Sequence, residues 1–162
     1  MTLFDELLAA NAGYLADRTP DDSPAAPSRR LAVVTCMDAR LDVLGALGLE
    51  LGQAHVLRNA GGIVTSDVLR SLAISQRALG TNSIAIIQHT LCGMSGFDDA
   101  AFRSELASTG ELPDWDVPGF DDVHHSVRQS VERVRSSSWL PERGLVAGFV
   151  FDVRTGEITR AD

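Results

Sequence analysis

Two short apolar runs limit what this chain can fold into more than any other feature. Residues 31–35 and 83–88 carry apolar side chains at positions that would face both sides of a sheet. Such runs are typical of central strands in a parallel sheet, where helices cover both faces. Each run leads directly into residues of the types that bind metals: Cys36 follows the first run, and His89 and Cys92 follow the second. The two cysteines of the chain therefore both stand at or near the end of an expected strand.

Segments with helical periodicity alternate with the expected strands. Helices are predicted at 42–47, 65–79, 98–106 and 121–135, strands at 31–35, 54–58, 83–88, 145–153 and 157–159, and a loop at 110–119. The turn residues at 154–156 predict that the last strand folds back as a hairpin. This alternation predicts an α/β fold with a mostly parallel four-stranded sheet and an antiparallel edge strand, flanked by helices.

The first 29 residues form an arm in this scheme. Apolar side chains at 3, 4, 7, 8 and 15 predict a helix over 3–15. The polar, proline-rich run 19–28 predicts an extended linker. We therefore expect one domain over 1–162, with a helical arm at 1–29 and an α/β core at 30–162. The pattern leaves open whether the arm packs on its own core or on a partner subunit.

Composition excludes some classes of partner. With 14 basic and 22 acidic side chains the net charge is -8, which argues against nucleic acid because phosphates attract Lys and Arg patches. No apolar run approaches the roughly 18 residues of a membrane helix, and the first residues lack the pattern of a signal peptide. We expect a cytoplasmic protein with no membrane partner and reduced cysteines. A Cys36–Cys92 disulfide and two unrelated buried thiols are the alternatives.

Cys36, His89 and Cys92 have the side-chain types that zinc favours. Ligands bind beyond the carboxyl ends of the strands in open α/β sheets, so Cys36 and His89 should meet there if their strands are neighbours. The spacing of three positions places Cys92 within reach of the same ion. Three protein ligands leave a fourth position for water, whose pKa zinc lowers toward neutrality. The pattern thus predicts a catalytic Zn2+ site.

Asp38 and Arg40 follow the first cysteine closely. Asp38 could accept a hydrogen bond from a zinc-bound hydroxide, while Arg40 holds the carboxylate by a bidentate pair. Alternatively, Asp38 could bind the metal as a fourth ligand and close the site. In the simplest structural alternative, Asp38 caps a helix and Arg40 is a surface residue.

Three motifs carry a family resemblance. They are Cys-Met-Asp-Ala-Arg at 36–40, Val-Leu-Arg-Asn-Ala-Gly-Gly at 56–62 and His-Thr-Leu-Cys-Gly-Met at 89–94. Together they closely resemble the β-class carbonic anhydrases of the small prokaryotic subtype, over about residues 31 to 158 and including the hairpin at 152–156.

The resemblance implies zinc bound by Cys36, His89 and Cys92, with Asp38 and Arg40 as a gating dyad. It implies reversible hydration of carbon dioxide to bicarbonate through a zinc-bound hydroxide. It also implies a homodimer or a tetramer of dimers, with the active sites at the dimer interface and the N-terminal helices crossing to the partner.

Gly61 and Gly62 fit such a site, because glycine lets the backbone approach a ligand closely. We expect them to line a small substrate pocket, with Asn59 bracing their loop. A plain turn between a strand and a helix is the alternative.

Leu91 departs from the family pattern, in which Asp commonly precedes the second cysteine. If Leu91 lines the substrate entrance, it would suit carbonyl sulfide or carbon disulfide, which relatives on this fold hydrolyse. Hydrolysis of these analogues is the runner-up activity, although we favour an interpretation in which Leu91 points into the core and alters nothing. A non-enzymatic zinc site closed by Asp38 is a further alternative. Arg40 disfavours it, because a nearby cation competes for the carboxylate.

Overall fold

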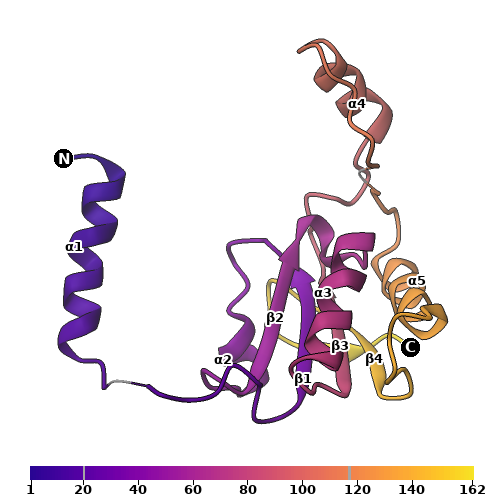
Figure 1. The fold of residues 1–162 in the computed structure, drawn as a ribbon. Coiled ribbons are helices and arrows are strands. Elements are labelled where there is room, and N and C mark those ends of the chain that lie inside the picture. The colour runs from indigo at the N-terminus through magenta and orange to yellow at the C-terminus, as the bar shows by residue number, and fades with distance from the viewer. Residues whose placement is uncertain (20, 117) are drawn as a thin grey trace.

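Figure 1 shows the computed structural model, which describes residues 1–19, 21–116 and 118–162. Pro20 of the expected linker and Val117 of the expected loop lie outside the described residues. The helices are α1 (Leu3–Ala16), α2 (Val43–Leu47), α3 (Ser66–Arg77), α4 (Asp99–Ala107) and α5 (Val123–Ser136), with a 3-10 helix η1 (Ala60–Gly62). The strands are β1 (Leu31–Cys36), β2 (Ala54–Asn59), β3 (Ser83–His89), β4 (Val146–Phe151) and β5 (Ile158–Arg160). Each helix and strand expected from the sequence is present, with small shifts at the ends.

The strands form one five-stranded sheet in the order β2-β1-β3-β4-β5. β1 pairs with β2 and β3, and β3 pairs with β4, all in parallel. β5 runs antiparallel to β4 at the edge. The predicted mostly parallel sheet with an antiparallel edge strand is therefore confirmed. Because β1 and β3 are neighbours, the residues at their carboxyl ends come together.

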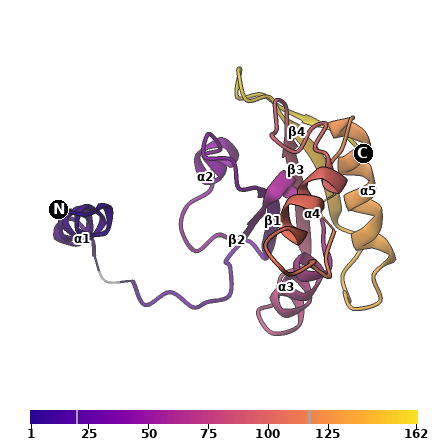
Figure 2. The same cartoon turned by 90° about the horizontal axis from the view of Figure 1, so that it is seen from above.

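Apolar side chains of the central strands alternate between the two faces of the sheet. On one face, Val34 and Ile86 pack in a cluster with side chains of α3 and α5. On the other face, Val33 and Ile87 pack in a cluster with side chains of α2. Figure 2 shows the sheet between α2 on one side and α5 on the other. Burial of both faces explains why these strand sequences are apolar throughout.

α1 stands apart from the α/β body in both views (Figures 1 and 2). A capping box between Thr2 and Asp5 begins the helix. No residue of α1 is buried against the described part of the chain, and Leu3, Phe4 and Leu8 are 65%, 74% and 72% exposed. The structure thus gives the apolar side of α1 no partner on its own core. No helix among the described residues has the length and apolar composition needed to cross a membrane.

The end of the linker is fixed to the core beside β2. The amide of Ser28 donates to the carbonyl of Gly52 at 2.9 Å. Nε2 of His55 donates to the carbonyl of Ala25 at 3.1 Å. The chain is therefore anchored before it enters β1.

Candidate metal centre

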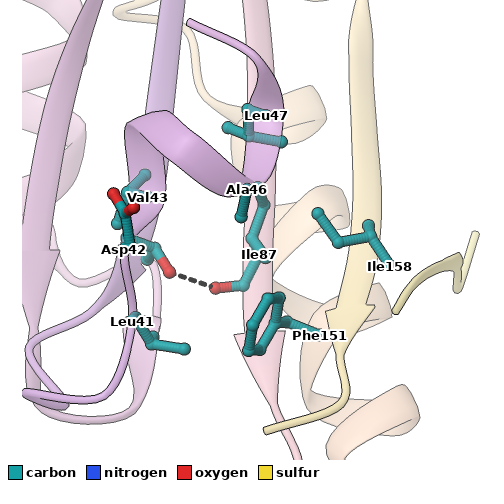
Figure 3. Close-up of a pocket in the computed structure, with 9 residues that line it drawn as sticks. Leu41, Asp42, Val43, Ala46, Leu47, Ile87, Phe151 and Ile158 are labelled. Carbon is teal, nitrogen blue, oxygen red and sulfur yellow. Dashed lines mark hydrogen bonds between the residues drawn. The ribbon is translucent and has the colours of Figure 1, made fainter. Parts of the chain in front are cut away.

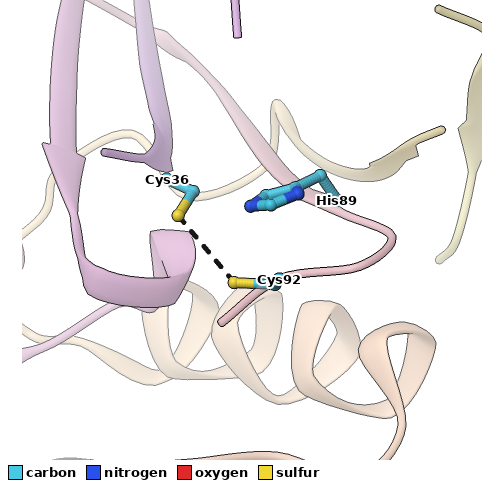
Figure 4. Close-up of side chains that lie close together, drawn as sticks. All are labelled: Cys36, His89 and Cys92. Atoms are coloured by element: carbon cyan, nitrogen blue, oxygen red, sulfur yellow. Dashed lines mark hydrogen bonds between the residues drawn. The ribbon is translucent and has the colours of Figure 1, made fainter. Parts of the chain in front are cut away.

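Figure 4 shows Cys36, His89 and Cys92 facing one another. Cys36 is the last residue of β1, and His89 is the last residue of β3. Cys92 lies in the turn that follows β3, and all three residues are buried. The structure therefore brings together the three residues that the sequence pattern predicts as metal ligands.

The distances between these side chains suit one ion. The three donor atoms lie within 4.8 Å of one another. Sγ of Cys36 and Sγ of Cys92 are 3.9 Å apart, close to the roughly 3.8 Å expected for two thiolates about 2.3 Å from a tetrahedral zinc. Both cysteines are free rather than joined in a disulfide.

His89 is held in the tautomer that binds a metal. Nδ1 of His89 and the carbonyl oxygen of Thr90 are 2.9 Å apart, and since a carbonyl only accepts, Nδ1 carries the proton. Nε2 therefore keeps a free lone pair.

That Nε2 atom is buried and has no hydrogen-bond partner among the described residues. Its charged neighbour, Oδ2 of Asp38, lies 3.7 Å away, beyond hydrogen-bond distance. A buried polar atom without a partner is costly, and a bound cation would satisfy it. Two thiols and an imidazole nitrogen are the donors that zinc prefers, so the residues present fit a zinc ion.

The Cys92 thiol resists ionisation when no cation is near. Burial raises the pKa of Cys92 to about 11, and the neighbouring Cys36 adds to the increase, while the hydrogen bond with the amide of Met94 opposes it. Cysteine binds zinc as the thiolate. Binding of the metal must therefore displace this proton.

Asp38 and Arg40 form a bidentate ion pair next to the three clustered side chains. Nε and Nη2 of Arg40 donate to Oδ1 and Oδ2 of Asp38 at 2.9 and 2.7 Å, and the Arg40 amide donates to Oδ1 at 3.0 Å. These hydrogen bonds hold the pKa of Asp38 well below its usual range, against a smaller opposing effect of burial. Asp38 is not among the residues whose donor atoms cluster. Asp38 is thus paired with Arg40 and stands outside the cluster, and a role for Asp38 as a fourth ligand stays a prediction.

Leu91 does not point into the core, so the interpretation favoured from the sequence was wrong. Leu91 is 55% exposed. Its φ of 54° lies in the left-handed region, which is unusual for leucine. The turn directs the carbonyl of Leu91 to Nη2 of Arg40, which donates to it at 3.0 Å. An exposed apolar side chain therefore stands beside the ion pair.

Gly61 and Gly62 are both buried, with φ values of 78° and 62°. A Cβ atom on Gly62 would lie 2.8 Å from the backbone nitrogen of Cys36 and 2.8 Å from the carbonyl carbon of Thr35. Glycine is required here because the turn packs directly on the backbone at Cys36. That these glycines also line a substrate pocket stays a prediction.

Two further polar residues hold the site in place. Asn59 braces the glycine turn as expected, because Nδ2 donates to the carbonyl of Ile63 at 2.8 Å and Oδ1 accepts from its amide at 3.0 Å. Thr90 orients His89 through its carbonyl and accepts a hydrogen bond from the amide of Val153 on its hydroxyl at 3.1 Å. Sequence analysis missed Thr90, since no side-chain pattern signals a role carried by a carbonyl group.

A small apolar pocket of about 20 Å³ adjoins the site below α2 (Figure 3). Leu41 and Phe151 line it and also belong to the apolar cluster around the two cysteines. The Thr35 hydroxyl donates to the carbonyl of Ile87 at 2.8 Å, and the Asp42 carboxylate caps α2. Thr35 and Asp42, the polar residues of this pocket, thus already have hydrogen-bond partners. The unpartnered polar atom Nε2 of His89 lies in the cluster beside the Asp38–Arg40 ion pair instead.

Comparison with known proteins places the chain in a family. A family model described as carbonic anhydrase matches residues 31–118, which contain Cys36, His89, Cys92 and the Asp38–Arg40 ion pair. Beta-carbonic anhydrase 1 of Mycobacterium tuberculosis is 46% identical over 159 residues, which is 98% of this chain and 97% of the relative. The chain belongs to the β-carbonic anhydrase family.

Two further proteins are similar to most of the chain. A carbonic anhydrase structure from Streptococcus mutans has a TM-score of 0.92 and 41% identity, and the match covers 100% of this chain and 99% of that one. A carbon disulfide hydrolase of Saccharolobus solfataricus is 51% identical over 158 residues, which is 82% of this chain and 77% of the relative. Relatives with two different named activities are therefore similar to this chain.

Proposed function

We propose that the chain interconverts carbon dioxide and bicarbonate with a zinc ion held by Cys36, His89 and Cys92. The observation that carries this proposal is the buried Nε2 of His89, which lacks a partner among the described residues and faces two thiols 3.9 Å apart. Zinc bound there would supply the Lewis acidity that lowers the pKa of a water to near neutrality. The Mycobacterium tuberculosis enzyme, which matches 98% of this chain, supports the same activity.

Asp38 is suited to orient the attacking water rather than to remove its proton. Arg40 holds the pKa of Asp38 well below its usual range, so this carboxylate is a weak base near neutral pH. Oδ2 of Asp38 lies 3.7 Å from Nε2 of His89, within reach of a water beside the ligands. A hydrogen bond to Oδ2 would aim a lone pair of that water at the carbon atom. The same ion pair disfavours the closed, non-enzymatic site, because Arg40 competes for the carboxylate.

Stopped-flow hydration of carbon dioxide tests the proposal. We expect the zinc-loaded protein to catalyse hydration with a kcat/KM of at least about 10⁴ M⁻¹s⁻¹. A chelator should abolish the activity, and added zinc should restore it. A sample with one zinc per chain that hydrates no carbon dioxide at any pH between about 6 and 9 would contradict the proposed activity.

Hydrolysis of carbon disulfide or carbonyl sulfide is a second candidate, and the exposed Leu91 favours it. Carbon disulfide has a larger apolar surface than carbon dioxide, so an apolar side chain beside the ion pair would favour its entry. The hydrolase of Saccharolobus solfataricus supports this alternative, although its match covers 82% of this chain. Both activities should therefore be measured on one zinc-loaded sample.

Leu91→Asn separates the two candidates. Asparagine tolerates the left-handed backbone at this position, so the substitution changes polarity without straining the turn. If Leu91 selects sulfur substrates, the ratio of carbon disulfide to carbon dioxide kcat/KM should fall by about 3- to 10-fold. A ratio equal to that of the wild type would show that Leu91 does not set substrate preference.

We also propose a homodimer in which α1 of each copy packs on the other. Large apolar side chains along α1, Leu3, Phe4, Leu7 and Leu8 among them, are exposed, and such a surface needs a partner. Light scattering should give the mass of two chains, or of four or more where dimers associate further. Phe4→Glu combined with Leu8→Glu should lower that mass, whereas Ala9→Glu, on the opposite side of the helix, should not. A wild-type mass of one chain at micromolar concentration would exclude this assembly.

A further inference from the structure

Arg58 lies in the motif at 56–62 and donates hydrogen bonds to the backbone of the loop that carries Cys36 and Asp38. β2 pairs with β1 so that Arg58 lies opposite Thr35. Its guanidinium reaches the loop 36–41, where Nε donates to the carbonyl of Cys36 at 2.9 Å. Nη2 donates to the carbonyl of Asp38 at 2.6 Å, and Nη1 donates to that of Leu41 at 3.4 Å. One side chain from the neighbouring strand thus holds three carbonyl groups of a single loop.

This loop carries both parts of the proposed chemistry. Cys36 at its start is a metal ligand in the proposed site, and Asp38 is the carboxylate that would orient water. Arg40 fixes the side chain of Asp38, whereas Arg58 fixes its backbone. The carbonyl of Asp38 also accepts from the amide of Leu41 at 3.1 Å, so the turn and the guanidinium meet at the same oxygen atom.

The geometry of arginine suits this task. The planar guanidinium offers five N–H donors in a fixed fork, which a single ammonium group cannot reproduce. Its contacts are to backbone atoms, so they do not depend on the rotamers of Cys36 and Asp38. A metal site relies on such supporting hydrogen bonds to keep its ligands aimed at the ion.

We propose that Arg58 is a positioning residue that fixes Cys36 for the metal and Asp38 for the attacking water at the same time. This inference rests on the proposed zinc site. Arg58 acts through the loop and touches none of the three metal-ligating side-chain atoms. Loss of Arg58 should therefore weaken zinc retention and lower the hydration rate together. Loss of Arg40 should lower the rate and leave zinc retention unchanged.

The rate of zinc release into an excess of a chromogenic chelator tests this difference without relying on activity. We expect Arg58→Met to release zinc about 10- to 100-fold faster than the wild type. Arg58→Lys keeps a cation with fewer donors and should give an intermediate rate. Arg40→Met should release zinc within about twofold of the wild-type rate. Arg70→Met is the matched control, because Arg70 lies on α3 and pairs with Asp67.

The visible spectrum of the cobalt-substituted protein gives a second readout. A loosened loop should change the absorption bands of cobalt in Arg58→Met and leave them unchanged in Arg70→Met. A protein whose fold is merely less stable would unfold at a lower temperature without either effect. Zinc release and cobalt spectra equal to those of the wild type would overturn the role of Arg58 and leave the proposed function intact. A wild-type chain that binds no zinc would overturn both.

Discussion

Replacing Cys36 with serine is expected to remove zinc and carbon dioxide hydration together. Serine keeps the shape of the side chain, but its hydroxyl does not give up its proton to a metal near neutral pH as a thiol does. His89 and Cys92 would remain as the two strong donors of the cluster. We expect zinc affinity to fall by at least about 100-fold. Zinc per chain after dialysis and stopped-flow hydration on the same sample measure the two losses.

Thr35→Ser is the matched control for this change. Thr35 precedes Cys36 in β1, and its hydroxyl bonds the carbonyl of Ile87 at 2.8 Å, a contact that serine can keep. This variant should retain zinc and activity, which would show that a serine in β1 does not itself disrupt the site. Hydration by a metal-free Cys36→Ser protein at the wild-type rate would rule out the zinc mechanism.

The clustering of Cys36, His89 and Cys92 was predictable from the sequence because two physical rules act together. Strands buried on both faces have nearly continuous apolar sequences, which located β1 and β3. The carboxyl ends of neighbouring parallel strands share one edge of the sheet, which brought Cys36 and His89 together. The turn after β3 then placed Cys92 with them, as the spacing of three positions predicted.

The direction of Leu91 was not predictable in the same way. The residue type alone predicts a buried side chain, since leucine is among the residues most often buried. The turn after β3 overrides that preference: its left-handed backbone turns the Leu91 carbonyl to Arg40 and leaves the side chain 55% exposed. A periodic pattern carries no information on such a turn, because only one residue departs from the regular backbone.

The hydrogen bonds of Arg58 could not be predicted from the sequence either. Its position at the end of a strand was clear from the sequence, but its partners are the carbonyl groups of a distant loop. Every residue has a carbonyl, so no residue type marks these acceptors.

The surface that α1 packs on could not be predicted from the sequence for a different reason. The apolar stripe predicted the helix correctly, yet a stripe does not identify the surface that covers it.

Asp38→Asn is expected to keep zinc and to lose at least about 100-fold in kcat/KM, because a misdirected water reacts far more slowly. Asparagine cannot offer two carboxylate oxygens to Arg40, so the bidentate pair is lost. Zinc content should stay at the wild-type level, since Asp38 lies outside the ligand cluster. Zinc analysis and stopped-flow hydration across pH values measure both properties.

The pH profile adds a test with a definite sign. Hydrogen bonds from Arg40 hold the pKa of Asp38 well below its usual range, so Asp38 is already an anion across the assay range. We therefore expect any rise of wild-type activity with pH to reflect ionisation of the attacking water. A nearby negative charge opposes that ionisation, so removing it in Asp38→Asn should shift the midpoint to lower pH by about 0.5–1 unit.

Asp98→Asn is the matched control, because Asp98 caps α4 and asparagine caps a helix equally well. It should match the wild type in zinc content, rate and midpoint. Loss of zinc in Asp38→Asn would instead make Asp38 a metal ligand and favour the closed site. A midpoint that moves to higher pH would mean that the carboxylate promotes ionisation of the water, and Asp38 would then have to act as a base.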